Sequence, residues 1–302
     1  MNRNFNLRLL LRRTAMWMLF AIVFVGMSGN RVFGQLPMTR SVFTAAYTPI
    51  SVLGGATAST IPLNSDDGTQ TLIPIGFTFN YLGTNYTTVD ACANGWISFA
   101  AGGANAWTNA NLFTTTTPNL TLAPWWDDMN TGSIGTILYQ TQGVVGSRTF
   151  TVQWTDLLSY NGSARTVNFQ CILYEGTNVI EFRYGTLGSG AFSTSESASI
   201  GIEGATGGAG NFLDAVSGSA FINQSYMTTH KWPAANIRFT PGAPTALPGG
   251  TYTVGIAGTF PNLSEAIANV NHRGISGPVT LSLIDATYDT TLTGGRNTFP
   301  LM

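Results

Sequence analysis

A short acidic stretch that begins at Asp127 has the residue types needed for metal binding. Asp127 and Asp128 are followed by Asn130 and Gly132, an alternation that resembles part of a calcium loop, where a hard cation gathers carboxylate and carbonyl oxygens. The later carboxylate that completes such loops is missing. The alternative is a polar turn whose Asp side chains bond nearby backbone amides. The sequence thus offers a calcium site at Asp127, Asp128 and Asn130, and Asp66-Asp67-Gly68 is predicted to be a simple hairpin turn.

Flat aromatic rings offer a second kind of site, because they stack on sugar faces. Trp107 lies in a Gly- and Asn-rich segment, residues 102–109, and it is the tryptophan that we expect to be exposed and to contact a ligand. Most of the other tryptophans fall at core spacing on expected strands, where large aromatic side chains fill a sandwich. These are Trp96, Trp125, Trp126 and Trp154.

The chain has two cysteines, Cys92 and Cys171. In an oxidising compartment they could pair, and the closed loop would contribute roughly 4 kcal/mol. The alternative is two unpaired residues that pack as small hydrophobic side chains. Cys171 is in register with Val167, Phe169 and Leu173, on the apolar face of its strand, whereas the direction of Cys92 is ambiguous. Both alternatives remain open from the sequence.

Catalytic motifs are absent from the sequence. It has two histidines, and it contains no Gly-x-Ser-x-Gly elbow, no His-Glu-x-x-His and no phosphate loop. We therefore predict that the chain is not an enzyme and needs no cofactor, calcium apart.

The N-terminus has the layout of a secretory signal peptide. Arg3, Arg8, Arg12 and Arg13 precede an uncharged apolar run from Ala15 to Met27, and Gly34 supplies a small residue ahead of Gln35. The apolar run is short for a membrane span of roughly 20 residues. We predict a signal peptide at residues 1–34 and a secreted or cell-surface protein with no membrane span in the mature chain; the alternative is an uncleaved anchor.

Composition and charge narrow the choice of partners. Charged residues make up 9% of the chain, against about 25% in an average soluble domain. The predicted leader holds five of the 13 basic residues and none of the 14 acidic ones, so the mature chain has a net charge of −6. A basic nucleic-acid footprint and a polybasic membrane patch are both missing. We expect an extracellular protein or glycan as partner, and the oligomeric state is open.

Period-two alternation dominates from about residue 40 to residue 240. Ile73, Ile75, Phe77, Phe79 and Tyr81 alternate with mostly polar or small residues, and similar strands with turn residues between them continue to Ile237–Phe239. About ten short strands predict an all-β, antiparallel β-sandwich of the jelly-roll kind over residues 35–240.

A different pattern follows a Pro- and Gly-rich segment at 241–250, which we expect to be a semi-stiff linker. Tyr252–Gly255 is predicted to be a strand. Leu263, Ala266, Ile267 and Val270 then form a helical stripe, with Asn262 as N-cap and Gly274 as C-terminal stop. A second strand contains Val279, Leu281 and Leu283. Residues 251–302 are therefore expected to form a short β-α-β segment.

Several motifs carry a family resemblance. Ile75-Gly-Phe-Thr-Phe79, Asn94-Gly-Trp-Ile-Ser-Phe99 and Ala123-Pro-Trp-Trp-Asp-Asp128 resemble the N-terminal, nidogen-like β-sandwich of large secreted surface proteins of Bacteroidota-type bacteria. The resemblance covers roughly residues 40–240. The stretch from Gly250 to Leu281 resembles the opening strand, capping helix and first coil of a right-handed parallel β-helix.

The second resemblance implies that the chain is incomplete. A β-helix coil needs about 20 or more residues, and stacked coils must bury one another, yet only 54 residues follow Pro248. We therefore expect residues 251–302 to be an incomplete β-helix cap and the chain to be an N-terminal fragment; the alternative is a mini-domain that leans on the sandwich.

Two classes of function follow. The first is a non-catalytic extracellular adhesion or structural module. The second is an ancillary carbohydrate-binding domain of a polysaccharide-degrading enzyme whose catalytic β-helix lies beyond residue 302.

Overall fold

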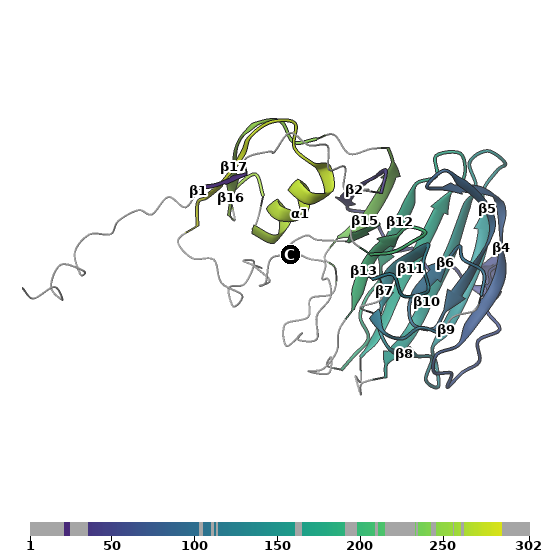
Figure 1. Cartoon of the computed structure of the whole chain (residues 1–302). Helices are drawn as coiled ribbons and strands as arrows, with labels where there is room; N and C mark the ends of the chain where they lie inside the picture. Colours follow the sequence, from purple (N-terminus) through teal and green to yellow (C-terminus); the bar gives the residue numbers. More distant parts are fainter. Residues whose placement is uncertain are drawn as a thin grey trace, which may run out of the picture.

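The computed structural model describes residues 21–24, 36–102, 105–109, 112, 114–160, 165–190, 198–208, 211–214, 233, 235–242, 246–255, 257–260 and 263–285. Two antiparallel sheets stack face to face, and a β-α-β unit follows them in the chain (Figure 1). The all-β sandwich expected from the sequence is confirmed.

The larger sheet has eight strands, including two-residue strands at its margins. Its order is β2 (Met38–Phe43), β15 (Asn236–Pro241), β12 (Ile180–Tyr184), β11 (Thr166–Tyr174), β10 (Thr149–Ser159), β9 (Thr136–Gln142) and β3 (Thr57–Ala58), and β8 (Met129–Asn130) pairs with the end of β10. A short 3-10 turn, η1 (Val52–Gly54), precedes β3.

The smaller sheet has six strands. Its order is β14 (Phe212–Asp214), β13 (Ser199–Glu203), β7 (Thr121–Trp126), β6 (Trp96–Ser98), β5 (Thr84–Cys92) and β4 (Thr69–Tyr81). A register shift between Ser199 and Gly201 bulges β7 against β13. Trp125 and Trp126 belong to different hydrophobic clusters, because neighbouring side chains of a strand point to opposite faces of the sheet.

The main core lies between the two sheets. The alternating apolar residues of β4 face this core as expected. Those that are buried are Ile73, Ile75, Phe77, Phe79 and Tyr81. From the larger sheet, Trp154 stacks on Phe169 with ring centroids 4.9 Å apart, and its Nε1 donates to the Cys92 carbonyl oxygen at 2.8 Å. Large aromatic side chains therefore fill the sandwich and link its two sheets.

Alternation alone would indicate that the outer face of the larger sheet is exposed to solvent. Part of this face is instead covered. Thr151 and Gln153 are buried, because residues 48–50 cross this face. Gln153 exchanges hydrogen bonds with the backbone of Ile50, at 2.8 Å and 3.1 Å. Gln170 Nε2 donates to the Thr48 carbonyl oxygen at 2.9 Å and to Gln153 Oε1 at 2.7 Å. Buried amides thus hold an irregular segment on the sheet.

The segment that joins the two units is shorter than the expected linker at 241–250. Pro241 is the last residue of β15. Leu247 is buried in a second hydrophobic cluster, and its amide donates to the Gly274 carbonyl oxygen at 2.9 Å. The C-terminal unit therefore begins before residue 250.

In that unit, β16 (Gly250–Val254) and β17 (Val279–Leu283) pair in parallel, and α1 (Leu263–Arg273) lies between them in the chain. Leu263 and Ala266 are buried, and Ile267 and Val270 pack against the same cluster, which confirms the helical stripe. Gly274 ends α1 with a φ of 68°, a left-handed conformation that favours glycine. The predicted N-cap, Asn262, lies outside the described residues, as do residues 286–302.

Most of the predicted leader also lies outside the described residues. Within it, β1 (Ala21–Phe24) pairs antiparallel with β17. Among the described helices, none has the length and apolar character needed to cross a bilayer.

Candidate functional site

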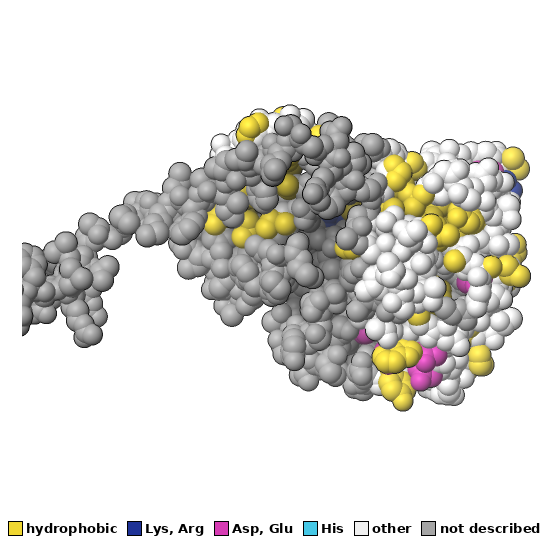
Figure 2. All heavy atoms as spheres, in the orientation of Figure 1, with side chains coloured by type: hydrophobic (Ala, Val, Ile, Leu, Met, Phe, Trp, Pro, Cys, Tyr) yellow, Lys and Arg dark blue, Asp and Glu magenta, His cyan; other side chains and the backbone are white. Residues whose placement is uncertain are grey.

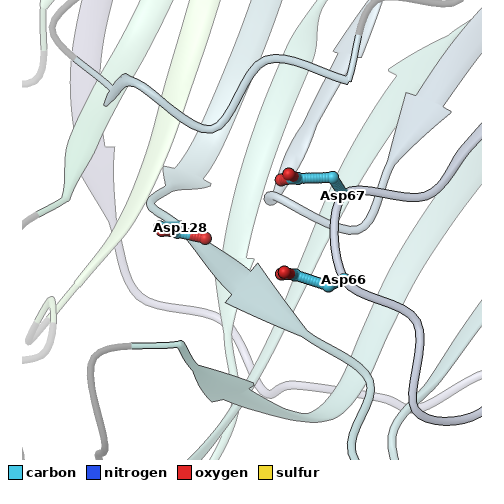
Figure 3. A group of neighbouring side chains, drawn as sticks. All are labelled: Asp66, Asp67 and Asp128. Carbon is cyan, nitrogen blue, oxygen red and sulfur yellow. The ribbon is translucent and has the colours of Figure 1, made fainter.

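An acidic cluster lies where the loop before β4 meets the connection between β7 and β8. Asp66, Asp67 and Asp128 each contribute a carboxylate oxygen, and these three oxygens lie within 4.8 Å of one another. Figure 3 shows the three carboxylates directed toward a common space from two segments of the chain. Among the described residues this is the group of side chains with the composition of a metal site, and its all-oxygen character suits a hard cation such as calcium.

Backbone hydrogen bonds hold the loop of Asp66 and Asp67 against β8. Asp66 forms an isolated bridge with Asn130. The Ser65 amide donates to Thr131 Oγ1 at 2.9 Å, and the Thr131 amide donates to the Ser65 carbonyl oxygen at 3.0 Å. The arrangement of the three carboxylates therefore depends on a loop that is held against a strand about 60 residues away in the sequence.

Asn94 organises the other side of the cluster. This residue is fully buried. Its Nδ2 donates to Asp67 Oδ1 at 2.7 Å, and its Oδ1 accepts the Met129 amide at 2.8 Å. One amide side chain thus connects the turn between β5 and β6 to both acidic segments.

Proximity and partial burial change the proton affinity of these carboxyl groups. Desolvation, together with the charges of Asp66 and Asp67, raises the pKa of Asp128 to about 6. Desolvation and the charge of Asp67 also raise the pKa of Asp66. Like charges that crowd together in this way favour either a proton or a bound cation.

The site differs from the one predicted at Asp127, Asp128 and Asn130. Asp128 lies in the cluster, and Asn130 is joined to Asp66 through the backbone. Asp127 is buried and is not a member of the cluster. Asp66 and Asp67, which the sequence indicated to be a simple hairpin turn, supply two of the three carboxylates. The sequence does not indicate that these carboxylates come together, because their proximity depends on a contact between segments that are far apart in the chain.

Trp107 is 53% exposed, in agreement with the expectation of an exposed side chain. The residue before it anchors the segment, because the Ala106 carbonyl oxygen accepts hydrogen bonds from Trp96 Nε1 at 2.9 Å and Trp126 Nε1 at 3.1 Å. Asn94 Nδ2 also donates to this oxygen, at 3.3 Å. Trp107 therefore projects from a segment that is tied to the outer face of the smaller sheet.

The four tryptophans that were expected at core spacing are buried. Trp96, Trp125, Trp126 and Trp154 are each at most 1% exposed. Trp96 and Trp126 pack with Cys92 and Leu112 in a small cluster on the outer face of the smaller sheet. None of these four rings is available to a ligand.

Both cysteines are free and buried, so the disulfide that the sequence left open is not formed in this structure. Cys171 belongs to the core between the sheets, whereas Cys92 belongs to the outer cluster with Trp96. Ala91 and Ala93 face the core, and Cys92 between them faces away from it because strand side chains alternate. The two thiols therefore point into different clusters.

A polar groove of about 340 Å³ lies on the outer face of the larger sheet. Its lining includes Gln140, Gln142, Gln170, Tyr174 and Arg183. The amide and hydroxyl groups donate and accept hydrogen bonds, and the charged Arg183 guanidinium donates them. On the described part of the face in Figure 2, few side chains are charged, and hydrophobic side chains lie among uncharged ones.

Glu181 fixes Arg183 beside this groove. Its carboxylate is 2% exposed and pairs with Arg183 at 2.7 Å and Arg238 at 2.6 Å, and Tyr174 donates its hydroxyl to Glu181 at 2.8 Å. Burial would raise the pKa of Glu181, but the hydrogen bonds from Arg183, Tyr174 and Arg238 outweigh it and lower the pKa. The network is a structural support for the groove.

Comparison with known proteins gives one match. A family model described as NIDO related matches residues 39–241. No curated protein and no solved structure matches the chain.

Proposed function

Because the chain belongs to the NIDO-related family, we propose that it is a non-catalytic extracellular module that serves adhesion or scaffolding. In this proposal the sandwich is the N-terminal part of a longer secreted or cell-surface protein of a Bacteroidota-type bacterium. Its partner is an extracellular protein or a glycan.

The observation that carries the proposal is the extent of the family match. The match begins in β2 and ends with β15, and these two strands are neighbours in the larger sheet. The family unit and the folded sandwich therefore coincide. Loops on such a rigid scaffold are the usual carriers of binding.

The C-terminal unit supports the idea of a longer protein. Two parallel strands with a helix between them provide the first rung of a parallel β-structure, and an open strand edge is a template for further pairing. Here β1 covers the edge of β17, and β1 lies inside the predicted signal peptide. Cleavage ahead of Gln35 would free that edge for a following strand, as in a parallel β-helix.

Within this function we propose that the acidic cluster binds calcium through Asp66, Asp67 and Asp128, with Asn130 beside them. Three carboxylates supply up to six oxygens, and calcium takes six to eight. The bound ion would fix the loop before β4 against β8. Calcium is thus proposed as a structural ion of the module.

The second candidate function, an ancillary carbohydrate-binding domain, is favoured by the exposure of Trp107. A half-exposed indole on an anchored segment can stack on a sugar ring. The groove beside Arg183 lies on the outer face of the other sheet, and it offers hydrogen bonds to hydroxyl groups as a separate surface. The two candidates differ in the ligand class that the loops bind.

Binding by the secreted full chain to immobilised extracellular proteins and to a polysaccharide panel tests the proposal. The Trp107→Ala variant is compared with Leu53→Ala, since Leu53 is also a large exposed hydrophobic residue. Retention on a protein ligand supports the adhesion module. Retention on polysaccharide that Trp107→Ala abolishes and Leu53→Ala preserves supports the carbohydrate-binding alternative, and hydrolysis of any retained polysaccharide would overturn the non-catalytic assignment.

A further inference from the structure

Glu203 is a fully buried acidic residue at the end of β13. Ile200 and Ile202 of this strand face the core between the sheets. Because side chains alternate along a strand, Glu203 faces the outer side of the smaller sheet. The Tyr81 hydroxyl donates to its backbone carbonyl oxygen at 2.8 Å, which leaves its carboxylate to be satisfied by other groups.

Among the residues that the structure describes, no hydrogen-bond donor reaches that carboxylate. In the described part of the chain, both Glu203 side-chain oxygens and Asn119 Oδ1 are buried without a hydrogen-bond partner. Unsatisfied buried acceptors are rare in folded proteins, and each calls for a physical explanation.

These oxygens converge on the backbone of Gly207. A Cβ at this position would collide with the Thr114 carbonyl oxygen and with Glu203 Oε1, and it would lie 2.9 Å from Asn119 Oδ1. The φ of Gly207 is 57°, in the left-handed region that glycine tolerates. Three oxygens from three segments therefore lie close to one another beside the Gly207 Cα.

A proton and a cation are the two species that could satisfy such a set. Desolvation raises the pKa of Glu203 to about 9, so an isolated carboxylate is costly here. A proton would give a single O–H donor to one of the acceptors. A cation would contact Glu203, Asn119 and the Thr114 carbonyl together, and carboxylate, amide and carbonyl oxygens are the ligands that calcium uses.

We propose that Glu203, Asn119 and the Thr114 carbonyl oxygen form a second calcium site on the outer face of the smaller sheet. It is separate from the acidic cluster, because Ile202 pairs with Leu122 near the start of β7, whereas Asp128 follows the other end of that strand. A single carboxylate gives a weak site, with a dissociation constant of about 10⁻⁴–10⁻³ M as in extracellular modules.

Such a site would tie two loops together. Residues 114–120 precede β7, and residues 204–208 follow β13. Their present connections include a hydrogen bond of 2.8 Å from the Gly208 amide to the Thr114 carbonyl oxygen. Calcium would add a strong bridge between them and stabilise the start of β7.

The test uses the full chain in an Asp67→Asn/Asp128→Asn background, which disables the acidic cluster. Thermal unfolding is followed with and without about 10 mM calcium chloride, at constant ionic strength set with sodium chloride. We expect calcium to raise Tm by about 3–11 °C. Added Glu203→Gln, which keeps the shape of a protonated carboxyl group, should abolish this rise without loss of the fold. Terbium emission sensitised by nearby Tyr81 should be lost in parallel.

Asn119→Asp separates a cation from a proton. A second carboxylate should tighten calcium binding about tenfold, because affinity follows ligand charge. The proposal is overturned if calcium leaves Tm unchanged, or if its effect survives Glu203→Gln. It is also overturned if Asn119→Asp lowers Tm and leaves calcium affinity unchanged, since the pair would then share a proton.

Discussion

Asn94 Nδ2 donates to Asp67 Oδ1 at 2.7 Å, and this hydrogen bond joins the turn between β5 and β6 to the acidic loop. The same side chain accepts the Met129 amide. A buried neutral amide therefore holds the Asp67 carboxylate and the backbone next to Asp128 in place without neutralising their charge. Charge neutralisation is left to a proton or a bound cation.

Asp128→Asn should stabilise the chain in EDTA and remove the part of the calcium stabilisation that comes from the acidic cluster. The substitution relieves repulsion within the cluster, and we expect the free energy of unfolding to rise by about 1 kcal/mol after allowance for solvent screening. Urea unfolding in EDTA measures this gain, and calcium titrations of Asp128→Asn and Glu203→Gln separate the two proposed sites. An Asp128→Asn variant that is less stable than wild type in EDTA would show that repulsion is not the dominant effect.

Trp154→Ala should be far more destabilising than Trp107→Ala. Trp154 is fully buried, stacks on Phe169 and donates to Cys92, so its removal should cost about 3–5 kcal/mol. Trp107 is half-exposed, and its removal should change stability by less than about 0.5 kcal/mol. Denaturant unfolding of both variants provides the measurement, and equal losses would contradict the burial of Trp154 relative to Trp107.

The two thiols should be unreactive until the chain unfolds. Desolvation raises the pKa of Cys92 to about 12 and that of Cys171 well above its usual range, and the thiolate is the reactive form. Titration with a thiol reagent should therefore detect no fast-reacting thiol in the native protein and two in urea. Detection of no thiol in urea without reductant would reveal a disulfide.

Glu175 should contribute to stability against acid. The Arg148 guanidinium binds its carboxylate, at 2.6 Å for the closest pair, and the Arg148 and Gly146 amides donate to it as well. The hydrogen bond from the Arg148 side chain is the main cause of the lowered pKa of Glu175, about 2.

Folding lowers the pKa of Glu175, so its contribution to the free energy of unfolding is fully present above the ordinary carboxyl pKa near 4.5. This contribution is lost as the pH falls from 4.5 toward 2. Glu175→Gln should therefore lower Tm at pH 7 and flatten the acid side of the Tm profile between these values. Parallel profiles for wild type and variant would contradict the assignment.

The fold could be predicted from the sequence because buried apolar residues alternate with polar or small ones along β4. An apolar residue at every second position identifies the face of a strand that points into the core, even when the neighbouring strands are not known. The burial of Thr151 and Gln153 could not be predicted in this way, because it depends on residues 48–50, which cross the sheet from a distant part of the chain.

The acidic cluster was predicted only in part, because it too depends on contacts between distant parts of the chain. Asp128 carries a local signal, whereas Asp66 and Asp67 are indistinguishable from a turn until the register of β8 brings them to it. Glu203 gave no signal at all, since a glutamate at a strand end normally reaches solvent. Its burial follows from loops whose paths the sequence does not encode in a readable pattern.

Export of the full chain, with its own N-terminus, tests the extracellular assignment most directly. The chain is expressed in a bacterial host, and the cytoplasmic and exported fractions are compared by intact-mass and N-terminal analysis. We predict an exported protein that begins at Gln35 and hydrolyses none of the ligands it retains. An uncleaved chain that begins at Met1 and stays in the cytoplasm would contradict the proposed function.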